Sequence, residues 1–254
     1  MNAFKKTSAL LFSLLFLGAC SSKEVTPKLD QVQPKTLTVV TYNEENPTNF
    51  SYTWKDDLLT SYAVRTLNTA TGKDFIRKYD ITRNDKKLIE SMLYTFEGGG
   101  FPDGNIIQTY MYNSSKTQIN YLSTNWTYNN SNQLSNLNYG SRSVTGFIEH
   151  TYNNDNLLTK LSWKEGSYLD NTSTINAFTT MENPLYKIAK SLQFLHITYN
   201  TTDLIMMSAM LLPKSYNNGA VDNFVTYEAD DQNRVTLITV TNNGIILKKY
   251  TFTY

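Results

Sequence analysis

The sequence contains almost no cysteine, since Cys20 is the only one among its 254 residues. The part of the chain that follows it therefore cannot form a disulfide, a cysteine zinc site or a cysteine nucleophile. Histidine is nearly as rare, and His150 and His196 form neither an HxH nor an HExxH motif. Glu149 could join a histidine pair around a metal ion, but both histidines are better interpreted as polar residues at the ends of strands or helices. We therefore expect neither a metal nor a cofactor.

Familiar catalytic motifs are also missing. The sequence has no Gly-x-Ser-x-Gly elbow, and its Gly98–Gly100 run is not followed by the lysine of a phosphate-binding loop. The acidic pairs Asp56-Asp57 and Asp230-Asp231 could serve in glycoside hydrolysis or in calcium binding. Both pairs lie in turn sequences, however, where aspartate caps backbone N–H groups. The sequence therefore nominates no catalytic residue, and it favours a non-enzymatic protein over a glycan-active hydrolase.

The first twenty residues, MNAFKKTSALLFSLLFLGAC, have the order of a bacterial lipoprotein signal. Lys5 and Lys6 form a positive segment, and residues 9–17 form an apolar run that is too short to span a bilayer. The sequence LGAC resembles a lipobox, in which small residues precede the cysteine that receives a diacylglyceryl group. We predict that residues 1–19 are a signal peptide and that a lipid on Cys20 anchors the chain in a membrane.

The mature chain has no excess of positive charge. Removal of residues 1–19 takes away Lys5 and Lys6 and leaves 21 basic against 22 acidic residues, a net charge of −1. Such a chain has no electrostatic basis for binding nucleic acid. Residues 20–35 are polar and contain proline, which predicts a flexible tether. Serine rather than aspartate at position 21 favours sorting to the outer membrane, by analogy with other lipoproteins, and leaves its periplasmic and cell-surface faces open.

From Thr36 onward the chain is rich in tyrosine, threonine and asparagine. Tyrosine and threonine favour strands, and asparagine favours turns. Apolar and polar residues alternate through residues 157–164 and 250–254, a period that is typical of strands with one wet face. Most connections are short, which indicates antiparallel neighbours. We predict one all-β domain over residues 36–254, an antiparallel meander that forms a barrel or a strongly curled sheet.

A degenerate repeat supports this prediction. It consists of an aromatic residue, a turn rich in Asn and Asp, and an aliphatic residue that begins the return strand. Copies occur at residues 54–58, 112–119, 128–134, 152–157, 199–204 and 229–235, with a variant at 83–88. Each copy is interpreted as a hairpin, and Asn243-Gly244 is a further signal for a two-residue hairpin turn.

One segment departs from the strand pattern. Asn183 and Pro184 suit the N-cap and the first turn of a helix. The apolar residues that follow have the spacing of one helical stripe: Leu185, Ile188, Ala189 and Leu192. We predict a short helix at about residues 184–194 that covers an end of the sheet core. A helix on the membrane surface is the alternative interpretation, because Lys187 and Lys190 lie off the stripe.

Several of these features occur together in a known family. The lipobox, NPLYKIAKSLQFL (183–195), MLLPKSY (210–216) and the terminal YTFTY resemble uncharacterised Bacteroidetes lipoproteins with a porin-like β fold. The hairpin TYEADDQNRVTLITV is similar to a tyrosine–aspartate type of repeat, although Ala229 and Arg83 stand where an aromatic residue is usual. The resemblance covers most of residues 36–254 and implies an antiparallel barrel or curled sheet on a lipid anchor. It implies no catalytic residue.

Aromatic residues are the remaining candidates for ligand binding. Trp54, Trp126 and Trp163 could stack on sugar rings or line an apolar cavity, although aromatics at a period of two more often belong to the core. A barrel of many strands also encloses more volume than its side chains fill. We therefore expect a monomeric outer-membrane lipoprotein that binds a glycan or a small apolar ligand. A structural or adhesive surface protein is the second hypothesis.

The terminal sequence KKYTFTY resembles the last strand of a membrane-spanning barrel. Such a barrel needs a continuous apolar band toward the lipid. The candidate outward positions of this chain are instead polar: Lys160, Ser162, Lys164, Thr251 and Thr253. We predict that Tyr250, Phe252 and Tyr254 point into the core of the domain, and that this strand pairs with residues 236–242 through Asn243-Gly244.

Overall fold

The computed structural model describes residues 33–100, 102–115, 118–121, 124–140, 145–165, 169–195, 201–219 and 221–254. The chain forms two units, Met1–Gln31 and Val32–Tyr254, and the fold below is that of the second unit. The signal peptide and Cys20 lie outside the described residues, so both stay predictions. No helix in the described ranges is long and apolar enough to cross a bilayer.

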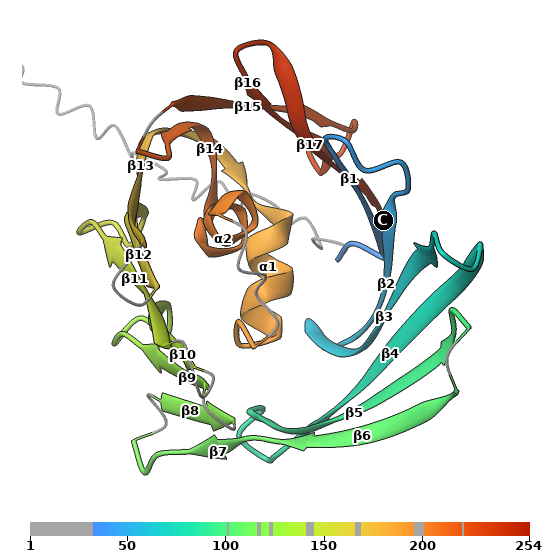
Figure 1. Ribbon diagram of the computed structural model, residues 1–254. Helices are drawn as coiled ribbons and strands as arrows, with labels where there is room; N and C mark the ends of the chain where they lie inside the picture. The colour runs from blue at the N-terminus through green and yellow to red at the C-terminus, as the bar shows by residue number, and fades with distance from the viewer. Residues whose placement is uncertain are drawn as a thin grey trace, which may run out of the picture. The chain divides into compact units, whose positions relative to one another are not determined.

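Antiparallel strands make up most of the second unit, as the sequence predicts (Figure 1). The first half of the sheet consists of β1 (Thr36–Thr41), β2 (Thr48–Lys55), β3 (Leu58–Asn68), β4 (Lys73–Arg83), β5 (Ile89–Gly98), β6 (Gly104–Thr109), β7 (Met111–Tyr112), β8 (Gln118–Tyr121) and β9 (Thr124–Tyr128). The second half consists of β10 (Leu134–Gly140), β11 (Thr145–Tyr152), β12 (Leu158–Glu165), β13 (Leu169–Glu182), β14 (Leu211–Asn217), β15 (Asp222–Ala229), β16 (Val235–Asn242) and β17 (Ile245–Thr253). Two short helices, α1 (Pro184–Ser191) and α2 (Thr201–Ser208), connect β13 to β14.

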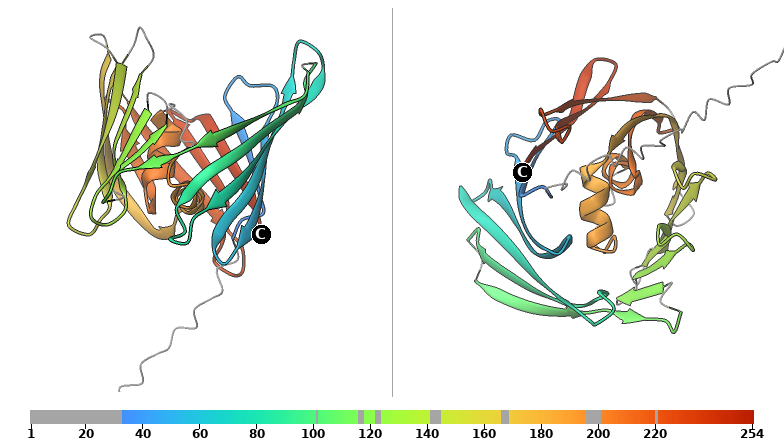
Figure 2. Two further views of the ribbon diagram at one scale, coloured as in Figure 1. Left: turned by 90° about the horizontal axis from the view of Figure 1, so that it is seen from below. Right: turned by 180° about the vertical axis from the view of Figure 1, so that it is seen from behind.

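The strands form a meander that curls into a barrel-shaped sheet (Figures 1 and 2). The two ends of the meander meet, because β1 pairs with β17 on one edge and with β2 on the other. The only step without a lateral pairing in the described part of the chain is the one from β6 to β7. There the strand simply continues, and the Tyr110 N–H donates to the Glu90 carbonyl at 3.0 Å. The sheet is therefore a nearly closed ring.

Four hairpin turns share one hydrogen-bond pattern. The side-chain oxygen of the first turn residue accepts bonds from the backbone N–H groups two and four residues later, and the first residues are Asn84, Asn129, Asn153 and Asp230. The residue three positions later is left-handed, with φ of 63° at Lys87, 56° at Asn132, 61° at Asn156 and 60° at Asn233. Asparagine and aspartate tolerate that conformation and cap their own turn, which explains their frequency in this sequence.

Two hairpins use the shortest possible turn. Asp56 and Asp57 have φ of 50° and 61°, and Asn243 and Gly244 have φ of 46° and 79°. Positive φ at both central residues is the type I′ geometry, whose twist matches that of the flanking strands. The Asn243-Gly244 turn joins β16 to β17, so the hairpin predicted for the end of the chain is confirmed.

Helix α1 begins as the sequence predicts. The Asn183 side chain accepts a hydrogen bond from the Leu185 N–H at 3.0 Å, and Pro184 occupies the first turn. The amide of Asn183 also donates to the Ala209 carbonyl at 2.9 Å, which ties the start of α1 to the end of α2. Both helices lie inside the ring of strands (Figure 1). The sequence predicts one helix at about residues 184–194 that covers an end of the core, whereas two helices lie inside the ring and α1 ends at Ser191.

The hairpin predicted at residues 199–204 is wrong, because Thr201–Ser208 is helix α2. Thr201, Thr202 and Asp203 suit a turn and a helix start equally well, so the turn signal is ambiguous. The next three residues, Leu204, Ile205 and Met206, favour the helix over the turn, because all three are fully buried. An unbroken apolar run does not alternate as a half-exposed strand does, and it suits a helix that is enclosed on all sides.

The two faces of β17 differ in polarity over its last residues. Tyr250 and Phe252 are 1% and 3% exposed, and Tyr254 packs against the same core, so the terminal strand faces inward as predicted. The alternate residues of β17 face outward, where the Thr253 and Thr36 hydroxyl groups lie 2.7 Å apart. At these positions the outer wall is polar where a spanning barrel is apolar.

Candidate functional site

The interior of the barrel contains a pocket of about 400 Å³. One side of this interior pocket is the wall formed by β1 to β4 and β17, and the other side is formed by α1 and α2. The apolar and aromatic lining residues are Leu37, Val39, Phe50, Tyr52, Tyr62, Val64, Tyr79, Leu185, Ile188, Leu192, Met207 and Tyr250. This volume and this lining are typical of sites for small molecules.

Strand register explains why the wall of the pocket is apolar. Leu37 of β1 lies opposite Phe252 on one side and opposite Phe50 on the other. Phe50 in turn lies opposite Val64, which lies opposite Arg77. Residues that are directly opposite in antiparallel strands share one face of the sheet. The alternation of these five strands therefore places the paired residues in one row on the inner face of the sheet. This row is apolar except at Arg77.

A second inward row is made of tyrosines. The rings of Tyr62 and Tyr79 stack at 4.4 Å between centroids, with planes 6° apart. The rings of Tyr79 and Tyr94 lie at 4.9 Å and 24°. Each aromatic pair of this kind contributes about 0.5–1.5 kcal/mol beyond the area that it buries. The tyrosine row therefore stiffens the wall of β3, β4 and β5 beside the pocket.

A buried ion pair joins the helices to the wall. The Lys248 Nζ lies 2.7 Å from one carboxylate oxygen of Asp203, and the Tyr250 hydroxyl donates to the other at 2.5 Å. Burial, together with the negative charge of Asp203, raises the pKa of the Tyr250 phenol, so this hydroxyl keeps its proton and acts as the donor. Both carboxylate oxygens of Asp203 therefore bind residues of β17. Because Asp203 belongs to α2, these contacts hold α2 against the wall beside the pocket.

The fold has a counterpart among solved structures. A porin-like protein from Bacteroides uniformis is similar over 86% of this chain and 95% of its own, with 16% sequence identity and a TM-score of 0.56. A second porin-like protein, from Bacteroides vulgatus, covers 87% and 98% with 11% identity and a TM-score of 0.32. Neither a protein-family model nor a curated protein matches the sequence. At this identity the first likeness shows a porin-like barrel fold and nothing about activity.

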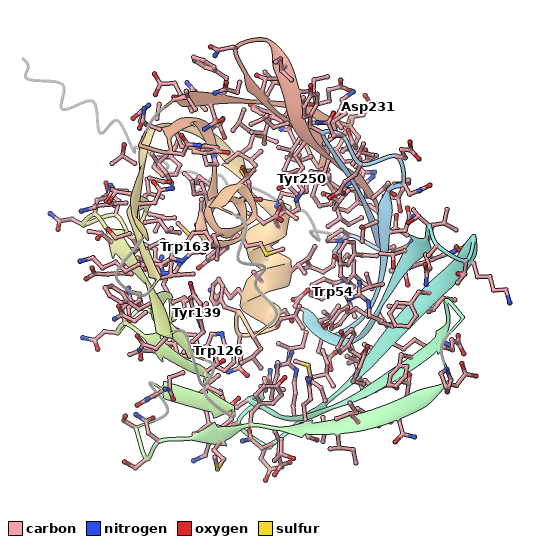
Figure 3. The ribbon with its side chains drawn as sticks, in the orientation of Figure 1. Trp54, Trp126, Tyr139, Trp163, Asp231 and Tyr250 are labelled. Atoms are coloured by element: carbon pink, nitrogen blue, oxygen red, sulfur yellow. The ribbon has the colours of Figure 1, made fainter. Side chains whose placement is uncertain are left out.

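The three tryptophans lie on the inner side of the ring (Figure 3), and none of them lines the pocket, although the centroid of the Trp54 ring lies 6.4 Å from that of the lining residue Tyr52. Each indole N–H donates within the protein: Trp54 to the Pro34 carbonyl at 2.8 Å, Trp126 to the Phe194 carbonyl at 3.1 Å, and Trp163 to the Tyr139 hydroxyl at 2.6 Å. Trp126 is also 5% exposed. Their role as ligand-binding residues stays a prediction, and the contacts that they make here are those of core residues.

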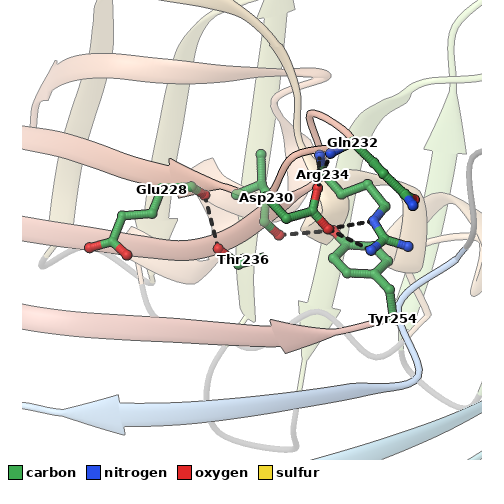
Figure 4. A network of polar contacts seen from close by, with 7 residues as sticks. Glu228, Asp230, Gln232, Arg234, Thr236 and Tyr254 are labelled. Atoms are coloured by element: carbon green, nitrogen blue, oxygen red, sulfur yellow. Dashed lines mark hydrogen bonds and ion pairs between the residues drawn. The ribbon is translucent and has the colours of Figure 1, made fainter.

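The two acidic pairs lie in turns. Asp56-Asp57 forms the β2–β3 turn, and Asp231 lies on the outside of the ring (Figure 3). Asp230 accepts the turn N–H groups of Gln232 and Arg234, and its other oxygen accepts from the Arg234 Nε at 2.7 Å (Figure 4). The same guanidinium stacks over the Tyr254 ring at 4.7 Å. These carboxylates shape the turns.

His150 is a core residue. It is 5% exposed, and its Nε2 lies 3.1 Å from the Ser208 hydroxyl of α2. Burial lowers the pKa of His150 to about 4, so the ring is neutral at pH 7. His196 lies outside the described residues. In the described part of the chain, no three His, Cys, Asp or Glu residues come together as a metal site.

The charged residues of the pocket are those that sequence reasoning missed. Lys248 precedes Tyr250 by two positions, so the alternation of KKYTFTY already places it on the inward face. Arg77 has the same relation to Phe75 and Tyr79. The sequence around Asp203 predicts a turn, so nothing in it indicates an inward charge. The alternation of a strand therefore predicts which of its charged residues point inward, whereas the inward charge of α2 could not be predicted in this way.

Proposed function

We propose that this protein is a lipid-anchored envelope protein that binds a small, mainly apolar molecule inside its barrel without chemically changing it. The observation that carries this proposal is the interior pocket of about 400 Å³ between the strand wall and the helices. The aliphatic side chains of Leu185 and Ile188 of α1, and of its C-cap residue Leu192, line the pocket. Transfer of apolar surface from water into such a pocket is favourable in itself.

The contacts of the pocket favour an apolar ligand over a glycan. A sugar needs several free polar partners, and Asp203, the buried carboxylate of the pocket, is already bound by Lys248 and Tyr250. The indole N–H groups of the tryptophans are engaged as well. A glycan remains an outcome that the binding assay can detect.

Two features support the envelope location and the anchor. The first of the two similar solved structures is described as porin-like, and porins are barrels of the outer membrane. The outward positions of β12 include the exposed Lys160 and Lys164, which suit water better than lipid tails. Lipidation of Cys20 would attach the chain to a membrane without requiring these lysines to enter the lipid.

Binding is tested with the chain of residues 20–254 carrying Cys20→Ser, titrated with the neutral dye N-phenylnaphthylamine. We expect saturable fluorescence enhancement that Val64→Phe abolishes, because Val64 lines the pocket and is 6% exposed. Ala63→Phe is the matched control, since Ala63 is the neighbouring residue on β3 and faces the other side of the sheet. Equal dye binding by both variants, with unchanged thermal stability, would show that the pocket is not the site. Glycan-array binding without dye binding would favour the glycan alternative.

A further inference from the structure

Arg77 is the unusual residue of the interior pocket. It lies on β4 directly opposite Val64, within the inward row that is otherwise apolar. Its guanidinium carbon lies 5.8 Å from the centroid of the Phe75 ring. In the β3–β4 register Tyr62 lies opposite Tyr79 and Val64 opposite Arg77, so Arg77 is two residues from Tyr79 on the same face and diagonal to Tyr62. Burial raises the pKa of both phenols, and the positive charge of Arg77 opposes this rise. A permanent charge therefore stands among aromatic and aliphatic side chains.

The Arg77 side chain is half-buried and has no carboxylate partner among the described residues. Its Nε is buried and has no hydrogen-bond partner among the described residues, and none of the ion pairs of those residues includes it. The other described arginines all donate to oxygen: Arg65 to Asp74, Arg83 to the Ser191 carbonyl, and Arg234 to Asp230.

The acidic residues of the pocket do not neutralise Arg77. Asp203 and Glu44 are the carboxylates that line the pocket. Asp203 forms its ion pair with Lys248, and Glu44 is exposed and forms no ion pair with Arg77 in the described part of the chain. Arg77 is half-buried, and even the partial removal of an unpaired charge from water is costly. A guanidinium presents a planar fork of donors that matches a carboxylate or a phosphate.

We propose that the ligand of the interior pocket is an amphiphile whose anionic group, a carboxylate or a phosphate, pairs with the Arg77 guanidinium. Its apolar part lies against Ile188, Leu192 and Met207 of the helices. This inference rests on the proposed function, since it names the class of ligand for the same pocket. A free fatty acid and a phosphorylated lipid share this chemistry, and the two are separated by comparing probes.

The test compares probes that differ only in the head group. Decanoate, decyl phosphate and neutral decanol are each titrated against the dye-loaded chain of residues 20–254 carrying Cys20→Ser. A hydrogen-bonded charge pair is worth about 1.5–3 kcal/mol, so we expect at least one anion to bind about tenfold or more tightly than decanol. Arg77→Met should remove this preference and leave decanol binding within about twofold, because a pocket without the charge still binds the apolar chain.

Two controls keep the outcomes separate. Lys78→Met removes one positive charge from the next residue of β4, whose ammonium group pairs with Glu97 on the exposed face at 2.9 Å, and it should retain the anion preference. Arg77→Lys should retain part of the preference, since it keeps the charge without the fork. Equal binding of decanoate, decyl phosphate and decanol by the unsubstituted Arg77 protein would refute the anion inference and leave apolar binding intact. Survival of the preference in Arg77→Met, or its loss in Lys78→Met, would also overturn it. No binding of any probe or of the dye would instead refute the proposed function.

Discussion

The buried pair of Asp203 and Lys248 should decide whether the helices stay docked on the barrel wall. The side chains are 9% and 11% exposed, respectively, so both charges have lost most of their hydration. Asp203→Leu leaves the Lys248 ammonium without a counter-ion, and breaking a buried pair in this way costs about 3–5 kcal/mol. The Tyr250 hydroxyl loses its acceptor as well, which adds about 1–3 kcal/mol.

Removal of both charges should be milder than removal of one. In Asp203→Leu/Lys248→Met the unpaired charge is gone, and apolar replacement of a complete ion pair is often near neutral. The cost that remains is the lost acceptor of Tyr250, about 1–3 kcal/mol. We therefore expect the double variant to be at least about 2 kcal/mol more stable than Asp203→Leu, which is a strong favourable coupling.

The assay is urea unfolding followed by tryptophan fluorescence and circular dichroism, for the two single variants and the double variant. The matched control is the same cycle on Lys78 and Glu97, whose side chains are 52% and 48% exposed. An exposed pair of this kind should couple by less than about 1 kcal/mol. Additivity within about 0.5 kcal/mol at Asp203 and Lys248 would refute the structural role that we assign to the pair.

Two further predictions concern acid and the anchor. Because burial lowers the pKa of His150 to about 4 from 6.5, the unfolded state takes up a proton first as the pH falls, and about 3 kcal/mol of stability should be lost between these values. The His150→Gln variant should lose much less of its stability over this range, and an equal loss in both proteins, measured by urea unfolding, would contradict the assignment. The full-length chain should fractionate with membranes and be released only by detergent, whereas Cys20→Ser should be recovered in the aqueous fraction. Membrane retention of Cys20→Ser would show that the chain has another attachment.

Local sequence signals predict the terminal hairpin, its inward face and the start of α1. Alternation places Tyr250 and Phe252 inside because successive side chains of a strand point to opposite faces. Asn183 and Pro184 mark the start of α1 because the amide caps an orphan N–H group and proline needs none. These signals act over a few residues, so at these positions they do not depend on distant contacts.

The arrangement that makes the pocket depends on contacts between distant residues. Closure of the ring pairs Thr36 with Thr253, and Asp203 meets Lys248 across 45 positions. The sequence around Asp203 fits a turn as well as a helix, and only the enclosure of Leu204 to Met206 favours the helix. The tryptophans were candidates because large aromatics often bind ligands, yet their N–H groups are used within the core. The pocket lies between the strand wall and the two helices, so its position could not be predicted without the position of α1 and α2.

The most direct test of ligand binding inside the barrel is a crystal structure of the protein with a terminally brominated decanoate, phased on the anomalous signal of bromine. We expect bromine density inside the barrel, between Val64 of the strand wall and Ile188 of α1, with the carboxylate on the Arg77 guanidinium. Bromine bound on the outer face of the sheet, with the interior pocket unchanged, would contradict this expectation.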